Sequence, residues 1–187
     1  ELNGWLESAL RQANRVVDVG ANDGYFTFGC AAAFRRLGKT GEIVAFEPMK
    51  QHFDTLKQSI KELTPKGTRI SLIQNLVGAE IQPGMTTLDA VCWQTGDSQS
   101  RAGALVKIDV EGAELDVLAG AGSWLNPSNY FLIEVHRESY LEIITRLFAD
   151  KGLTLERIDH RPLWLIGGEY RDDENWWLVS KLDSVKK

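Results

Sequence analysis

The chain has 187 residues, of which 43% are hydrophobic and 25% charged, and its formal net charge is −5. These values are ordinary for a globular domain, so they exclude a disordered or fibrous chain. The mild negative charge, without a basic block, disfavours nucleic-acid binding, because that affinity depends on neutralising phosphates. No apolar run reaches the roughly 18 residues that a membrane span needs.

The N-terminus and the cysteines indicate a cytoplasmic protein. The first residues have neither a basic nor an apolar region, so the sequence predicts no signal peptide. Cys30 and Cys92 lack Cys-x-x-Cys spacing, and we expect both to be buried thiols in a reducing compartment.

Short β-branched runs alternate along the chain with longer stretches of helical period. The expected strands are residues 15–19, 42–47, 69–74, 104–110, 130–135, 153–158 and 176–180. The expected helices are 26–37, 49–63, 114–125 and 139–151, after a leading helical segment in 1–14, and 161–174 is interpreted as a connecting loop or short hairpin. We therefore expect one domain over 1–187, a three-layer α/β sandwich with a mostly parallel sheet. The last two strands have no helix between them, which indicates one antiparallel strand.

The segment DVGANDG, residues 18–24, follows the first strand and opens the first helix. Gly20 allows a sharp turn and the close approach of a ligand, and Asn22 tolerates a left-handed backbone. The nicotinamide fingerprint G-x-G-x-x-G fails, because Asn22 and Tyr25 stand where its second and third glycines belong. A plain structural turn is the alternative interpretation.

Glu47 ends the second strand, directly before Pro48. In this topology the end of the second strand lies beside the glycine turn, so the carboxylate can accept hydrogen bonds from both ribose hydroxyls. A solvated acid or a helix N-cap is the alternative. Together with the glycine turn, Glu47 predicts a nucleoside ligand, and the absence of a Walker-type G-K-[ST] argues against a phosphate-binding loop.

Charged residues also break the apolar pattern of two central strands. Strand alternation places Lys107, Asp109 and Glu111 on one side, and Glu134 and His136 stand two apart at the end of the next strand. If these strands are neighbours, the four residues other than Lys107 converge on one crevice. The alternative is a structural set: a lysine paired with an acid, a helix-start glutamate and a loop histidine. No His-x-x-x-His or cysteine-rich spacing supports a metal, so none is predicted.

Five segments of this chain resemble, in order, the FkbM-type family of class I S-adenosylmethionine-dependent methyltransferases. They are VVDVGANDGYFTF (16–28), IVAFEP (43–48), TTLDAV (86–91), LVKIDVEGAELDVLAGA (105–121) and FLIEVH (131–136), of which KIDVEGAE is the specific one. The resemblance implies a Rossmann-like fold with strand order 3-2-1-4-5-7-6 and an antiparallel seventh strand. It also implies O-methylation of a hydroxyl on a sugar, glycan or small natural product.

The resemblance further assigns residues to the cofactor, S-adenosylmethionine. It implies that the cofactor is lined by Asp18, Gly20, Asn22 and Gly24, that Glu47 holds the ribose, that Asn75 and Leu76 lie near the adenine, and that Asp109 lies by the methionine end. One departure is that only about a dozen residues separate the third strand from TTLD, where relatives usually carry a longer insert. The identity of the acceptor therefore stays open.

An alcohol hardly ionises near neutral pH, so methyl transfer to it needs a group that removes the proton. We expect His136 or Glu111 to be that base, with Glu134 orienting the histidine, whereas Lys107 could instead organise the acids electrostatically. Two other functions stay open, a nucleotide-dependent oxidoreductase and a non-catalytic binding module with this fold. The sequence does not predict an oligomeric state.

Overall fold

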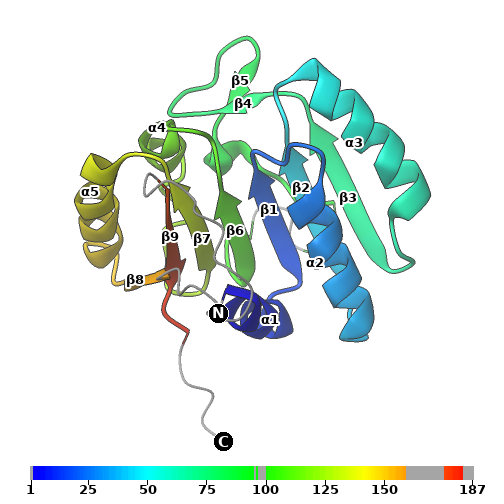
Figure 1. The fold of residues 1–187 in the computed structure, drawn as a ribbon, viewed down its shortest axis with the longest axis horizontal. Helices are drawn as coiled ribbons and strands as arrows, with labels where there is room; N and C mark the ends of the chain where they lie inside the picture. The colour runs from blue at the N-terminus through cyan, green and yellow to red at the C-terminus, as the bar shows by residue number, and fades with distance from the viewer. Residues whose placement is uncertain (1, 95, 97–99, 159–174, 183–187) are drawn as a thin grey trace, which may run out of the picture.

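A seven-stranded sheet runs through the centre of the molecule (Figure 1). The computed structural model describes residues 2–94, 96, 100–158 and 175–182. The strands of this sheet are β1 (Arg15–Val19), β2 (Gly41–Phe46), β3 (Thr68–Ile73), β6 (Ala104–Ile108), β7 (Tyr130–Val135), β8 (Leu155–Ile158) and β9 (Trp176–Ser180). Two short strands, β4 (Leu76–Val77) and β5 (Met85–Thr86), pair with each other outside it.

The strand order of the large sheet is β3-β2-β1-β6-β7-β9-β8. The pairs from β3 to β7 are parallel, whereas β9 is antiparallel to both of its neighbours. Without the short strands β4 and β5, this is the expected order 3-2-1-4-5-7-6 with an antiparallel seventh strand. The Rossmann-like fold expectation is confirmed.

Helices cover both faces of the sheet, as alternating side chains require. The helices are α1 (Leu2–Gln12), α2 (Tyr25–Arg36), α3 (Lys50–Leu63), α4 (Glu114–Ala119) and α5 (Glu138–Ala149), with a 3₁₀ turn at Leu88–Ala90. On one face, α1 and α2 pack against Val16, Ile43 and Leu105. On the other face, α4 and α5 pack against the alternate side chains of the same strands, such as Val17 and Val106. Within the described residues, no helix is long and apolar enough to cross a bilayer.

The helix expected over 114–125 is shorter in the structure, where α4 ends at Ala119. At Gly120 an added Cβ would lie 2.1 Å from the carbonyl oxygen of Gly78, next to β4. The chain then turns, and Trp124 is fully buried. Only a residue without a side chain allows this close approach of the Gly78 backbone at the end of α4. The loop expected at 161–174 lies outside the described residues.

The two cysteines differ in their surroundings. Cys30 lies fully buried in α2, and burial raises the pKa of its thiol well above the ordinary value. Cys92 is exposed, so the expectation of two buried thiols was wrong for this residue. It follows the 3₁₀ turn in an irregular segment, and the apolar neighbours Val91 and Trp93 take the buried positions instead.

Candidate functional site

The carboxyl ends of β1, β2 and β6 meet at one edge of the sheet, which is the upper edge in Figure 1. Val19, the last residue of β1, pairs with Phe46 on one side and Ile108 on the other. The N–H groups of Gly20 and Ala21 both donate to the carbonyl oxygen of Phe46, at 3.1 and 2.9 Å. The glycine turn is thereby fixed to the end of β2, where ligands of open α/β sheets bind.

Three residues of this turn have left-handed backbones. Gly20 has a φ of 79°, Asn22 of 49° and Gly24 of 89°. At Gly20 an added Cβ would lie 1.8 Å from the carbonyl oxygen of Asp109, which follows β6. At Gly24 it would lie 2.4 Å from the Leu56 side chain. The expected left-handed conformation at Asn22 is confirmed, and both glycines are required by close packing as well as by backbone conformation.

A buried charged pair supports the turn from inside the protein. Lys107 Nζ donates to the carbonyl oxygen of Gly20 at 2.7 Å, and lies 3.2 Å from a carboxylate oxygen of Asp18 and 3.2 Å from one of Asp109. The hydroxyl of Thr27 donates to the other Asp18 oxygen at 2.6 Å. Asp18 is fully buried, and through Lys107 it is connected to the backbone of the glycine turn.

The pKa of Lys107 reflects this environment. Burial alone would lower the pKa of the ammonium, but the charges of Asp18 and Asp109 and their hydrogen bonds outweigh it, so the pKa is raised. The ammonium is therefore charged at neutral pH. It lies between two carboxylates and reduces the repulsion between them at the centre of the site.

Glu47 lies directly beside the glycine turn, only 5% exposed. Its two carboxylate oxygens accept hydrogen bonds from the backbone N–H groups of Asn22, at 2.8 Å, and Met49, at 2.7 Å. A carboxylate oxygen has two lone pairs, so each oxygen can still accept one hydroxyl. The two backbone hydrogen bonds fix the orientation of the Glu47 carboxylate, to which a pair of ribose hydroxyls would donate.

Apolar side chains stand exposed near Glu47. The N–H of Glu47 donates to the carbonyl oxygen of Ile73, the last residue of β3, which brings residues 74–76 to this edge. Leu76 is 50% exposed and Met49 60% exposed, whereas Asn75 is half-buried. These features fit an adenosyl group, which is the part of the cofactor that the sequence resemblance implies here. They are the bare backbone at Gly20, the oriented carboxylate of Glu47, and the exposed apolar side chains of Met49 and Leu76.

A carboxylate–imidazole cluster lies at the other side of the Gly20 turn. Asp109, Glu134 and His136 each offer a ligand atom within 4.8 Å of the others, and His136 Nε2 lies 3.8 Å from an Asp109 oxygen. Three of the four residues expected to converge are therefore together. Glu111 is exposed with a φ of 50°, and it is not in this cluster, because β6 ends at Ile108 and strand alternation stops there.

The carboxylate that holds His136 is Glu114, which the sequence interpretation missed. Glu114 Oε1 lies 2.7 Å from His136 Nδ1 and accepts the N–H of Gly112 at 2.9 Å. Glu134 is expected to orient His136; in the structure Nδ1 of His136 contacts Glu114, whereas Glu134 lies in the same cluster and accepts a hydrogen bond from the Asn175 amide. Glu114 is fully buried, and its Oε2 atom has no hydrogen-bond partner within the part of the chain that the structure describes. A glutamate within the KIDVEGAE block was the available signal, but a helix-start acid is usually solvated.

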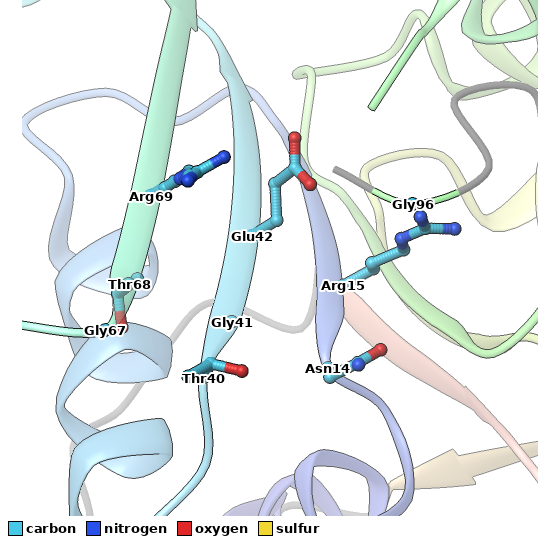
Figure 2. Close-up of a pocket in the computed structure, with 9 residues that line it drawn as sticks. All are labelled: Asn14, Arg15, Thr40, Gly41, Glu42, Gly67, Thr68, Arg69 and Gly96. Atoms are coloured by element: carbon cyan, nitrogen blue, oxygen red, sulfur yellow. The ribbon is translucent and has the colours of Figure 1, made fainter. Parts of the chain in front are cut away.

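A cavity of about 750 Å³ opens at the opposite edge of the sheet, where β1, β2 and β3 begin (Figure 2). In Figure 2 the charged side chains of Arg15, Glu42 and Arg69 come from these three neighbouring strands. It is lined by Asn14, Arg15, Thr40, Gly41, Glu42, Gly67, Thr68, Arg69 and Gly96. None of the expected site residues lines it, and its edge is not the one at which open α/β sheets bind ligands.

The chain is similar to known methyltransferases. The family model described as "Methyltransferase FkbM domain" matches residues 65–154. Hexuronic acid methyltransferase AglP from Haloferax volcanii is 27% identical over 175 residues, covering 83% of this chain and 70% of the relative.

Solved structures agree on the fold. Methyltransferase FkbM from Methylobacillus flagellatus KT superposes with a TM-score of 0.70 at 20% identity over 91% of this chain. This chain spans only 44% of that protein's length. M. capricolum TrmK, solved in complex with S-adenosyl-homocysteine, has a TM-score of 0.52 at 14% identity and covers 94% of this chain and 66% of its own. The region that the family model matches contains β6, α4 and His136, and there the chain is similar to FkbM methyltransferases.

Proposed function

We propose that this protein transfers a methyl group from S-adenosylmethionine to a hydroxyl oxygen of a carbohydrate acceptor. The family supports methyl transfer, and the relative AglP is named for a hexuronic acid. The observation that carries the choice of oxygen as acceptor is the hydrogen bond between His136 Nδ1 and the buried Glu114. That contact leaves Nε2 as the acceptor nitrogen at the cluster, which is what deprotonation of a hydroxyl requires.

The cofactor would be held by the first half of the chain. The backbone at Gly20, Asn22 and Gly24 would contact it, Glu47 would accept the ribose hydroxyls, and Leu76 and Asn75 would border the adenine. When bound, S-adenosylmethionine supplies an electrophilic methyl group on a positively charged sulfonium. Asp109 lies next to the Gly20 turn, and its carboxylate favours a cation there, although Lys107 offsets part of its charge.

The proton of the acceptor hydroxyl would go to His136 Nε2. Glu114 holds the ring in one tautomer and stabilises the imidazolium that forms, as buried carboxylates do for other histidine bases. Glu134, within 4.8 Å of the same cluster, would add negative charge that favours the imidazolium. Glu111 remains an alternative base, because its exposed position on the same loop leaves it open to an acceptor.

Calorimetric titration with S-adenosylhomocysteine tests the cofactor site. We expect binding to the wild type, no binding of NADH, and a Glu47→Ala variant that binds roughly tenfold to a hundredfold more weakly, because two hydroxyl hydrogen bonds to a charged group are lost. Glu62→Ala, which removes an exposed carboxylate at the far end of α3, is the matched control and should bind normally. Binding of NADH instead of S-adenosylhomocysteine would support the oxidoreductase alternative.

A screen for radiolabelled methyl transfer onto sugars and glycosides then tests the acceptor class. We expect product with at least one glycoside and none with an analogue whose hydroxyls are all blocked. Cofactor binding without transfer to any hydroxylated compound would contradict the proposed acceptor class and support a non-catalytic binding module.

A further inference from the structure

Arg137 follows His136 directly and precedes the first residue of α5. Its guanidinium is exposed, but two contacts with Tyr140 hold it in place. Nη1 donates to the Tyr140 hydroxyl at 3.1 Å, and the guanidinium carbon lies 5.3 Å from the centre of the same ring. A long side chain that is already ordered loses less conformational entropy when it binds a ligand.

The Arg137 side chain lies across the loop between β6 and α4. Its Nε and Nη2 atoms would be 3.3 and 3.5 Å from a Cβ placed on Gly112, so the missing side chain at Gly112 gives it room. The N–H of Gly112 donates to Glu114 Oε1, the same atom that contacts His136 Nδ1. The guanidinium therefore lies against the loop that also positions the proposed base.

The positive charge of Arg137 is not paired with a carboxylate of the described residues. Among the described residues no carboxylate lies within ion-pair distance of it, although Glu138 is next to it in the chain and Glu111 adjoins Gly112. The other cation of this region, Lys107, is already shared by Asp18 and Asp109. A guanidinium has five N–H donors in a planar fork, and the Tyr140 contact uses one of them. The remaining donors match the two oxygens of a carboxylate.

We propose that Arg137 binds the carboxylate of an acidic sugar, so that the acceptor is a hexuronate and one of its hydroxyls is presented to His136. This inference rests on the proposed function, because it assigns part of the acceptor site of that reaction. It explains why, among the described residues, this cation has no carboxylate partner at an otherwise acidic edge of the sheet. The name of the relative AglP, a hexuronic acid methyltransferase, agrees with it.

The test compares two probes that differ only in the carboxylate, methyl β-D-glucuronide and methyl β-D-glucoside. Binding of each to the full chain is measured by ligand-detected NMR titration, with and without S-adenosylhomocysteine. We expect the wild type to prefer the glucuronide by about tenfold or more, which is what charge-assisted hydrogen bonds provide. Arg137→Ala should lose that preference and keep its affinity for S-adenosylhomocysteine. Arg137→Lys should keep part of the preference, because it retains the charge but not the fork.

Arg35→Ala is the matched control, since Arg35 is an equally exposed arginine in the last turn of α2, and it should behave as the wild type. Equal binding of the two probes, no binding of either, or an unchanged preference in Arg137→Ala would overturn the proposal. Failure of the wild type to bind S-adenosylhomocysteine would instead contradict the proposed function. The measurements without that compound still decide whether Arg137 recognises the carboxylate.

Discussion

Gly20 and Asp109 lie so close together that a Cβ on Gly20 would be 1.8 Å from the Asp109 carbonyl oxygen. Gly20→Ala must therefore separate β1 from the loop after β6, and its φ of 79° adds backbone strain. We expect a loss of about 2–4 kcal/mol in the free energy of unfolding and no measurable binding of S-adenosylhomocysteine. Urea denaturation and calorimetry measure the two effects.

Gly29 offers the matched control for this substitution. It lies inside α2, its φ is not positive, and nothing lies within 4 Å of an added Cβ. Gly29→Ala should stabilise the protein by roughly 0.5–1 kcal/mol through helix propensity and leave cofactor binding intact. An unchanged affinity in Gly20→Ala would contradict the role of this turn in binding the cofactor.

The His136–Glu114 contact predicts a kinetic result. His136→Gln should lower kcat by about 10²–10⁴-fold and leave the affinity for S-adenosylhomocysteine unchanged, because only the deprotonation of the acceptor is affected. Activity is measured with the glycoside that the screen identifies.

Glu114→Gln should also lower kcat, by roughly tenfold to a hundredfold, because the amide cannot stabilise the imidazolium. Glu138→Gln, an exposed glutamate at the start of α5, is the control and should be as active as the wild type. If His136→Gln keeps the wild-type kcat while Glu111→Gln loses it, Glu111 is the base.

The buried Lys107 predicts a strong effect on stability. Lys107→Met leaves Asp18, which is fully buried, without its ion pair, and we expect a loss of about 3–5 kcal/mol in the free energy of unfolding. Lys66→Met removes an exposed charge and should change that free energy by less than about 0.5 kcal/mol. A small effect of Lys107→Met would mean that Asp18 is neutralised in another way.

The raised pKa of Lys107 also sets the pH range of this stabilisation. Because the folded-state pKa lies above the ordinary value of 10.5, the contribution is complete below pH 10.5 and is lost as the pH rises through the folded-state value. The difference in stability between the wild type and Lys107→Met should therefore be constant from pH 7 to about pH 9 and shrink above 10.5. Urea titrations at these pH values measure it.

The cluster of Asp109, Glu134 and His136 predicts the response to divalent cations. With His136 as a base and Asp109 paired with Lys107, methyl transfer should be unchanged by a chelator and by added Mg²⁺ or Mn²⁺. Radiolabel transfer after dialysis against EDTA measures this. Activity lost to EDTA and restored by one of these ions would identify the cluster as a metal site instead.

The sequence predicts this fold well because its strands and helices have strong hydrophobic periods. The strands at 15–19 and 130–135 were predicted with their observed bounds, and the order of the large sheet follows from the family resemblance. The pair β4 and β5 was missed, because two-residue strands have no periodicity to detect. The end of α4 at Ala119 was missed, and the close contact of Gly120 with the distant Gly78 that follows it has no signal in the local sequence.

The part of the site that lies on or next to strands was predictable from the alternation of side chains along those strands. Alternation places Lys107 and Asp109 on one side, and the structure brings them within 3.2 Å. It fails at Glu111, where the backbone becomes left-handed beyond the end of β6. Glu114 was missed for a different reason, since only the three-dimensional packing of α4 against the end of β7 reveals that this carboxylate is buried next to His136.

The pairing of β1 with β6 has a consequence for how the protein folds. Arg15 is opposite Ala104, so the two middle strands come from distant parts of the chain and can pair only after β2, β3 and the helices between them have been synthesised. Such nonlocal pairing slows folding. The glycine turn packs directly against the loop after β6, so a nascent or truncated polypeptide without β6 would lack that side of the crevice.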